Sequence, residues 1–141
     1  MTTSVGITLT DARLLLEAVL DAGGLPVMAH AGQLQAAPGV MVAAANPWVT
    51  PFPVAGQLLR LSRWRVLMVG GAVDLEGILD QLGTMVQLTL MALDAGPPAW
   101  IVERSQVVGP SRLPTDNATY LVAECVVAIP VDLSTVPDPS P

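Results

Sequence analysis

The stretch from 118 to 129, ATYLVAECVVAI, constrains the fold most strongly, because it alternates over the full length of a strand. Successive strand residues point to opposite faces of a sheet, so this segment predicts a strand with two unlike faces. Pro130 is expected to end the regular ladder or to place it at a sheet edge. One face would carry Leu121, Ala123, Cys125, Val127 and Ile129, and the other Tyr120, Val122, Glu124 and Val126.

A second alternating segment, LRLSRWRVLMV at 59 to 69, predicts another strand, which Gly70-Gly71 should end. Trp64, Val66 and Met68 would share one face, and Arg63, Arg65 and Leu67 the other. Two further segments are strand candidates, PGVMVAAA at 38 to 45, ended by Asn46-Pro47, and AWIVERSQVV at 99 to 108. The polar stretch GPSRLPTDN that follows predicts a turn region.

Two amphipathic helices are expected. The first begins at Thr10, whose hydroxyl can cap the free N–H groups, and has Asp11 in its first turn and Gly23-Gly24 at its end. The second runs from about 75 to 94, after Asp74 as N-cap and before Gly96-Pro97-Pro98. The expected buried stripes are Ala12, Leu15, Leu16, Val19 and Leu20 in the first helix, and Leu75, Ile78, Leu79, Leu82, Val86, Leu90 and Leu93 in the second.

This order of elements predicts an α+β fold with a roughly four-stranded, mainly antiparallel sheet and two main helices packed on one face. The length of 141 residues suits one domain, which we place at 1–133. The Pro-rich tail at 134–141 is expected to be mobile.

The composition indicates a surface that is short of charge. Hydrophobic residues make up 52% of the chain and charged residues 13%, whereas a soluble domain usually has about 25% charged residues. Some apolar surface is therefore expected to lie against other chains. Gly, Pro, Arg or Asp interrupts every apolar run before it reaches the about 20 residues of a spanning helix, so we expect a soluble protein without membrane contact.

No enzymatic motif stands out, and the expectation is a protein that is not an enzyme and has no cofactor or metal. Cys125, the single cysteine, lies on the apolar strand face, where a buried and inert thiol is favoured over a nucleophile. His30, the single histidine, has no evident partner for general base catalysis. Gly70-Gly71 lies where nucleotide-binding loops occur, but Asp74 and Glu76 follow where phosphate would lie, which disfavours nucleotide binding.

Arg60, Arg63 and Arg65 are three of the six basic residues, and they flank Trp64. The net charge of −6 argues against phosphate contacts, although nucleic-acid contact and a plain solvated face stay open. Pairing with acidic neighbours, within or between subunits, is favoured. Glu124 is the first candidate partner, if its strand pairs with that of the arginines.

The segment NPWVTPFPVAGQL at 46 to 58 contains three prolines and no clear period. It predicts a long loop or arm that displays Trp48 and Phe52, and such loops are often functional. The alternative is a loop folded back on its own core. Because aromatic residues are enriched in interface cores, the expected contact surfaces are Trp48, Phe52, Arg60, Arg63, Arg65 and Glu124.

The order and length of these segments resemble the tail terminator proteins of long-tailed bacteriophages, especially those of actinobacterial phages. The resemblance covers nearly the whole chain and rests on DARLLLEAVLDAGG, PGVMVAAANPWVTPFP, SRWRVLMV, DLEGILDQLGTMV, WIVERSQVV and TYLVAECVVAIPVDL. It implies a ring, usually of six subunits, that stops polymerisation of the tail tube at its head-proximal end and joins the filled head. The implied partners are other copies of the chain, the tail tube protein, a head-completion or neck protein, and genomic DNA that passes through the lumen unread.

The location implied by the resemblance is the virion neck, after assembly in the host cytoplasm. An acidic lumen would let DNA slide, which suits the acidic balance of the chain. Two alternatives remain. One is a head-completion or neck connector protein from the same region of the virion. The other is a small bacterial α+β enzyme or ligand-binding domain, which would need a polar pocket built around His30, Cys125 and dispersed carboxylates.

Overall fold

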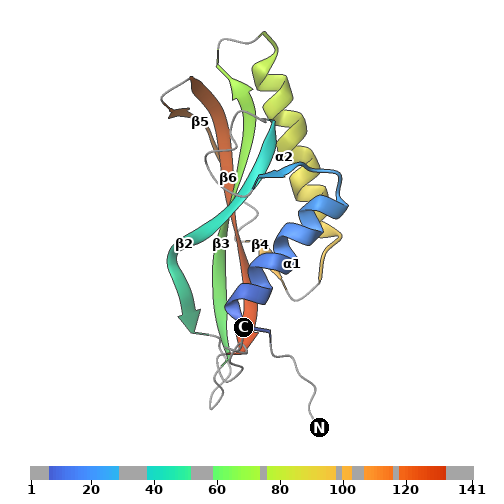
Figure 1. Cartoon of the computed structure of the whole chain (residues 1–141), viewed down its shortest axis with the longest axis vertical. Helices are drawn as coiled ribbons and strands as arrows, with labels where there is room; N and C mark the ends of the chain where they lie inside the picture. Colours follow the sequence, from blue (N-terminus) through green and yellow to red (C-terminus); the bar gives the residue numbers. More distant parts are fainter. Residues whose placement is uncertain are drawn as a thin grey trace, which may run out of the picture.

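In the computed structural model, two helices lie on one side of a long, twisted sheet (Figure 1). The structure describes residues 7–28, 38–51, 59–73, 76–97, 100–102, 107–115 and 118–132. The longest strands run along the longest axis of the molecule, which makes it elongated (Figure 1). The elements are α1 (Leu9–Ala22), β1 (Val27–Met28), β2 (Gly39–Pro51), β3 (Leu59–Ala72), α2 (Ile78–Asp94), β4 (Ile101–Val102), β5 (Val108–Pro114) and β6 (Thr119–Asp132).

The described residues form a six-stranded mixed sheet in the order β1-β2-β3-β6, with β4 and β5 both paired to β6. The pair β1–β2 is parallel and all the other pairs are antiparallel. The expected α+β class is confirmed, and the expected four strands correspond to the main part of this sheet. The two additional strands are β1, which has two residues, and β5, which has seven. Neither has an apolar alternation that could reveal it in the sequence.

The ladder between β3 and β6 is the centre of the sheet and runs from Leu59 opposite Asp132 to Ala72 opposite Tyr120. The prediction that Gly70-Gly71 ends β3 is wrong, because a register shift between Val69 and Gly71 lets the strand continue. Pro130 does not end the ladder, since β6 continues to pair with β3 as far as Asp132. The alternative, a position at a sheet edge, agrees with the described pairs, because β4 pairs with β6 only at Val127 and Ala128. A single missing N–H removes at most one hydrogen bond from a ladder of this length.

Strand β2 extends through Asn46-Pro47 to Pro51, so the predicted strand end and the first part of the predicted loop are wrong. The register with β3 shifts between Ala44 and Val49, and this irregularity accommodates the proline in a strand near the sheet edge. The rest of the predicted loop, residues 52–58 with Phe52, lies outside the described residues.

The opposite edge of the sheet is built by β4 and β5 one after the other along β6. Ile101 and Val102 pair with Ala128 and Val127, so the strand predicted at 99–108 is present at these two residues, whereas Val108 already belongs to β5. The predicted turn region at 109–117 is wrong for residues 109–114, because β5 pairs with β6 as far as Pro114. A turn follows directly, closed by the hydrogen bond from the Thr115 N–H to the Ala118 carbonyl oxygen. All β5 side chains except Leu113 are exposed, which explains why this edge strand has a polar sequence.

Helix α1 begins two residues before the predicted start. Thr8, not Thr10, is the N-cap, because the Thr8 hydroxyl accepts from the Asp11 N–H at 3.1 Å while the Asp11 carboxylate accepts from the Thr8 N–H at 3.3 Å. This reciprocal pair is a capping box. The buried residues are Ala12, Leu16 and Leu20, and Gly23 caps the C-terminus as expected. Leu15, predicted to be buried, is exposed.

Helix α2 begins at Ile78, later than predicted, and ends at Asp94 as predicted. Its N-cap is Gly77, with φ of 75° and no side-chain cap, so Asp74, which lies outside the described residues, is not the N-cap. Leu79, predicted to be buried, is 60% exposed. The buried face is rotated relative to the predicted stripe and consists of Leu82, Met85, Thr89, Ala92 and Leu93.

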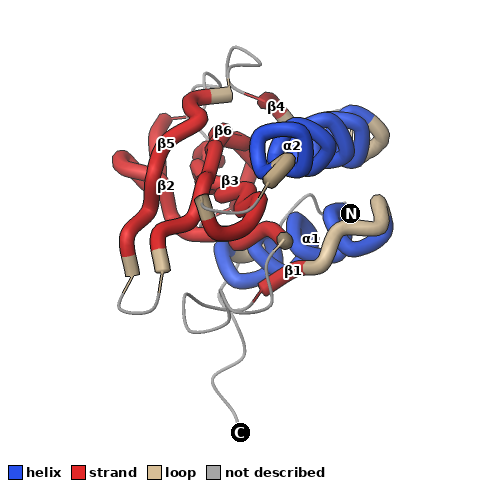
Figure 2. The backbone as a smooth tube through the Cα atoms, turned by 90° about the horizontal axis from the view of Figure 1, so that it is seen from above, coloured by secondary structure: helices blue, strands red, loops and turns tan. Residues whose placement is uncertain are grey.

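Two close approaches place α2 on the sheet and on α1. A Cβ atom at Gly70 would lie 2.9 Å from the Leu82 Cβ, and one at Gly23 would lie 2.6 Å from the Ala92 Cβ. The main core therefore lies between the helices and one sheet face, as seen along the long axis (Figure 2). A second cluster on the other sheet face contains Met28, Val69, Tyr120 and Val122.

Candidate subunit interface

Arg65 and Glu124 form a bidentate ion pair on the sheet face that points away from the helices. Arg65 lies opposite Val126 and Glu124 opposite Leu67, so the two charged side chains meet diagonally across β3 and β6. Arg65 Nη2 lies 2.8 Å from Glu124 Oε1 and Nε lies 3.1 Å from Oε2. This hydrogen bond raises the pKa of the Arg65 guanidinium. The pairing expected from the sequence is therefore present within one chain.

The other two arginines of the cluster are also in β3. Arg63 Nη1 donates to the carbonyl oxygen of Pro47 at 2.8 Å, which ties β3 to the irregular part of β2. Arg60 lies opposite Val131 near the start of the strand and is partly buried. Arg63 and Arg65 therefore have partners inside the chain, and this favours the paired interpretation of the cluster over phosphate contact.

Trp48 is 43% exposed and lies in β2 rather than in a loop. Its ring meets the buried ring of Trp64 edge-on, with centroids 5.7 Å apart and an angle of 82° between the planes. Trp64 Nε1 donates to the Ser62 hydroxyl at 2.9 Å, and this hydroxyl donates to the Ile129 carbonyl oxygen at 2.9 Å. Trp48 therefore packs on a buried indole whose N–H is hydrogen-bonded. The exposed part of the Trp48 ring is available to a partner.

Cys125 is 1% exposed and faces the main core from β6. Burial, followed by the negative charge of Glu124, raises the pKa of its thiol to about 11. The thiol is therefore protonated at neutral pH, as a poor nucleophile. His30 lies outside the described residues. Among the described residues, no group of three or more His, Cys, Asp or Glu side chains could hold a metal ion.

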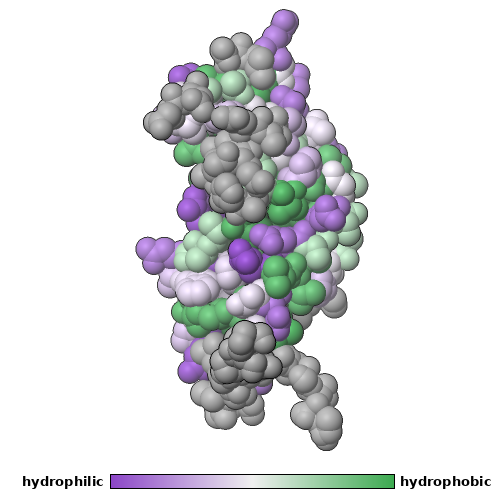
Figure 3. All heavy atoms as spheres, viewed as in Figure 1, coloured by the Kyte–Doolittle hydropathy of each residue, from purple (hydrophilic) through white to green (hydrophobic). Residues whose placement is uncertain are grey.

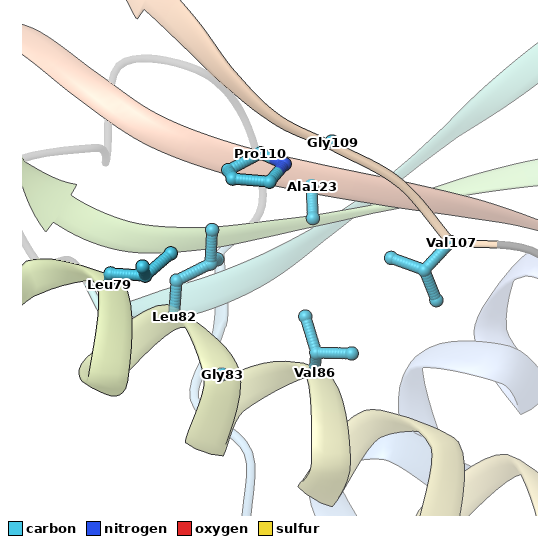
Figure 4. Close-up of a pocket in the computed structure, with 8 residues that line it drawn as sticks. All are labelled: Leu79, Leu82, Gly83, Val86, Val107, Gly109, Pro110 and Ala123. Carbon is cyan, nitrogen blue, oxygen red and sulfur yellow. The ribbon is translucent and has the colours of Figure 1, made fainter.

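The structure contains an apolar groove that was not predicted from the sequence. The groove has a volume of about 180 Å³ and lies between the first half of α2 and the start of β5. In Figure 4, Leu82 and Val86 point from the helix toward Ala123 and Pro110. Its lining consists of Leu79, Leu82, Gly83, Val86, Val107, Gly109, Pro110 and Ala123. The local signals for it are two glycines with different roles. A Cβ at Gly83 would meet nothing within 4 Å, whereas a Cβ at Gly109 would lie 2.9 Å from the Val122 carbonyl oxygen of β6.

Large apolar side chains reach the surface on several elements. They are Leu14 and Leu15 of α1, Trp48 of β2, Leu79 and Met91 of α2, and Val108 of β5. Figure 3 shows apolar patches on one face of the molecule, with polar residues between them. The exposure of Leu15 and Leu79 was the reverse of what their helical periodicity predicted. An apolar surface of this kind is what the low content of charged residues predicts.

Neither described helix combines the length and the apolar character that crossing a membrane requires. No protein-family model matches the chain. Comparison with curated proteins likewise gives no significant match.

Proposed function

We propose that this protein is a subunit of a ring that closes the head-proximal end of a phage tail tube. The observation that carries the proposal is the apolar surface of a single charge-poor chain, with exposed Leu14, Leu15, Trp48, Leu79, Met91 and Val108. Such side chains are stabilised when a partner covers them, so assembly with other chains is favoured. The choice of a tail terminator, rather than another assembly, rests on the resemblance in element order.

The α+β architecture supports this assignment. The helices cover one sheet face, and the molecule is elongated along one axis (Figure 1). An elongated subunit of this kind can pack side by side with its neighbours in a ring. Arg63 donates to the Pro47 carbonyl oxygen and Arg65 to Glu124, so both guanidinium groups already have acceptors within the chain. This supports a protein past which DNA moves without being bound. We expect no measurable sequence preference for duplex DNA, and only weak binding that disappears as salt is raised.

The first experiment measures the mass of the assembly and tests whether it binds tail tubes and stops their growth. Light scattering of the purified protein should give about six times the 14.6 kDa of one chain. Electron microscopy of tail tubes incubated with the protein should then show rings at one end and no further tube growth. A chain that stays monomeric at high concentration and does not bind tubes would contradict the proposal.

The same experiment separates the alternatives. A head-completion protein should bind filled heads or the neck side and leave tube growth unchanged. A small enzyme or ligand-binding domain should stay monomeric and lose activity when His30 and Cys125 are replaced by Ala.

A further inference from the structure

The outer surface where α1 and α2 meet is apolar. A Cβ atom at Gly23 would lie 2.6 Å from the Ala92 Cβ, and one at Gly96 would lie 3.3 Å from the Val19 Cγ1, so the two helices touch at these points (Figure 2). The residues beside these contacts on the solvent side are apolar and exposed. They are Leu14, Leu15, Ala18, Ala22, Met91 and Ala95, and we call them the helix seam.

The helix seam combines large and small apolar side chains. Leu14 and Met91 are 50% and 60% exposed, whereas the three alanines of the seam present only methyl groups. Small side chains let another backbone come close, and exposed large ones can pack between the side chains of a partner. A third helix can therefore lie along the seam with an apolar stripe of its own facing it.

The charged side chains on the faces that form the seam are acidic. Three exposed carboxylates each lie three residues along a helix from a seam residue, and therefore on the same face. The pairs are Asp11 with Leu14, Asp21 with Ala18, and Asp94 with Met91. None of the three carboxylates is in an ion pair within the part of the chain that the structure describes. A partner with positive charge is therefore favoured at this face.

Arg13 does not offset these charges, although it precedes Leu14 in the sequence. It lies three and seven residues before the buried Leu16 and Leu20, so it is on the flank of α1 that turns toward the core. The two helices together carry five carboxylates, three in α1 and two in α2, and this one guanidinium. A helix from a second copy would bring like charges together, which disfavours the chain itself as the occupant.

We propose that the helix seam binds a basic amphipathic helix of another protein, with its apolar stripe on the seam and its Lys or Arg side chains beside Asp11, Asp21 and Asp94. The inference goes beyond the proposed function, because this face can be occupied whether or not the chain forms a ring. Within the proposed ring, the exposed Trp48, Leu79 and Val108 remain for contacts between copies.

The first test measures binding of a helical probe to the whole chain. The probe is a fluorescently labelled synthetic peptide of about 18 residues, with Leu at the i, i+3, i+4 and i+7 spacing and Lys elsewhere. Anisotropy should show saturable binding that weakens as salt is added. The same peptide with Glu in place of Lys should bind at least roughly tenfold more weakly. Equal binding of the two peptides would overturn the proposal.

The second test removes an apolar contact of the seam. Leu14→Ser should weaken binding of the Lys probe roughly fivefold. Leu79→Ser is the matched control, because it makes the same change at an exposed leucine that lines the α2–β5 groove instead of the seam. The control should bind the probe as the wild type does. Equal loss in both variants, or none in Leu14→Ser, would overturn the assignment to the seam.

The third test reverses a charge beside the seam. Asp21→Lys should weaken binding of the Lys probe roughly three- to tenfold, because it replaces attraction by repulsion. Glu76→Lys makes the same change in net charge at an exposed residue before α2, at the far end of that helix from Met91, and should have little effect. Circular dichroism confirms that each variant is folded. Equal weakening by both variants would show that net charge alone governs binding and would overturn the proposal.

The outcomes separate this inference from the proposed function. A chain that forms rings on tail tubes but does not bind the Lys probe would overturn the inference and leave the ring proposal intact. A monomer that binds the probe at the seam would overturn the ring proposal alone. Loss of self-association in Leu14→Ser, without binding of the probe to the wild type, would assign the seam to a second copy and overturn the basic partner.

Discussion

Two neighbouring residues of β3, Trp64 and Arg65, show how different the two faces of the sheet are. Trp64 is 4% exposed between sheet and helices, and its indole N–H is bonded to a buried serine. Arg65 points the other way and keeps its charge at a partly exposed surface beside Glu124. The core face stabilises the fold mainly through buried area, whereas the opposite face combines a smaller apolar cluster around Val69 and Tyr120 with a weak ion pair.

The largest expected effect comes from the core face. Trp64→Ala removes a buried ring and leaves the Ser62 hydroxyl without its donor, so the free energy of unfolding should fall by about 3–5 kcal/mol. Denaturation in urea measures this loss. Trp48→Ala is the control, because its ring is 43% exposed and should cost clearly less. Equal losses would contradict the difference in burial.

The next effect is a pH dependence on the core face. The folded pKa of Cys125 is raised from 9.0 to about 11, so the unfolded chain loses this proton first as the pH rises. The contribution is fully present below pH 9 and is lost toward pH 11, where the free energy of unfolding should have fallen by roughly 2–3 kcal/mol. Urea denaturation at several pH values measures it. Cys125→Ala should lack this part of the decrease, and an unchanged profile in that variant would contradict the assignment.

A third effect tests the buried polar bond that serves Trp64. Ser62→Ala leaves the indole N–H without its acceptor, and the free energy of unfolding should fall by about 1–3 kcal/mol. Thr84→Ala is the matched control, since the exposed Thr84 hydroxyl only donates to the Asp80 carbonyl oxygen in its own helix. The control should change stability by less than about 0.5 kcal/mol. A loss at Thr84 as large as at Ser62 would show that burial does not set the cost.

The smallest effect is expected on the open face. Arg65→Met should lower the free energy of unfolding by less than about 1 kcal/mol, because the partly exposed pair is screened by solvent. A double-mutant cycle with Glu124→Gln isolates the coupling, which should shrink as salt is added. A coupling of several kcal/mol that salt does not alter would indicate that the pair is buried in an assembly.

The strand faces could be predicted because alternation is local. Trp64, Val66 and Met68 are buried together as predicted, and Cys125 faces the same core. The pairing of Arg65 with Glu124 followed once β3 and β6 were assumed to be neighbours. In these strands each side chain has only two possible directions, so the apolar pattern alone is enough to choose between them.

The helix faces were predicted less well. Leu15 and Leu79 match the apolar period of their helices, yet both are exposed. A helix can rotate about its axis, and Gly70 brings Leu82 onto β3 at the expense of Leu79. Strand β5 was missed for a related reason, since an exposed edge strand needs no apolar alternation.

The sequence by itself determined the class of the fold, the two central strands, the inward thiol and the surplus of apolar side chains, because each depends on local pattern or on composition. Only the tertiary structure decided which apolar side chains stay outside and where they gather. The groove arises from the distance between α2 and β5, two elements separated along the chain. That distance depends on the packing of α2 against β3 and on the pairing of β5 with β6, which no local pattern encodes.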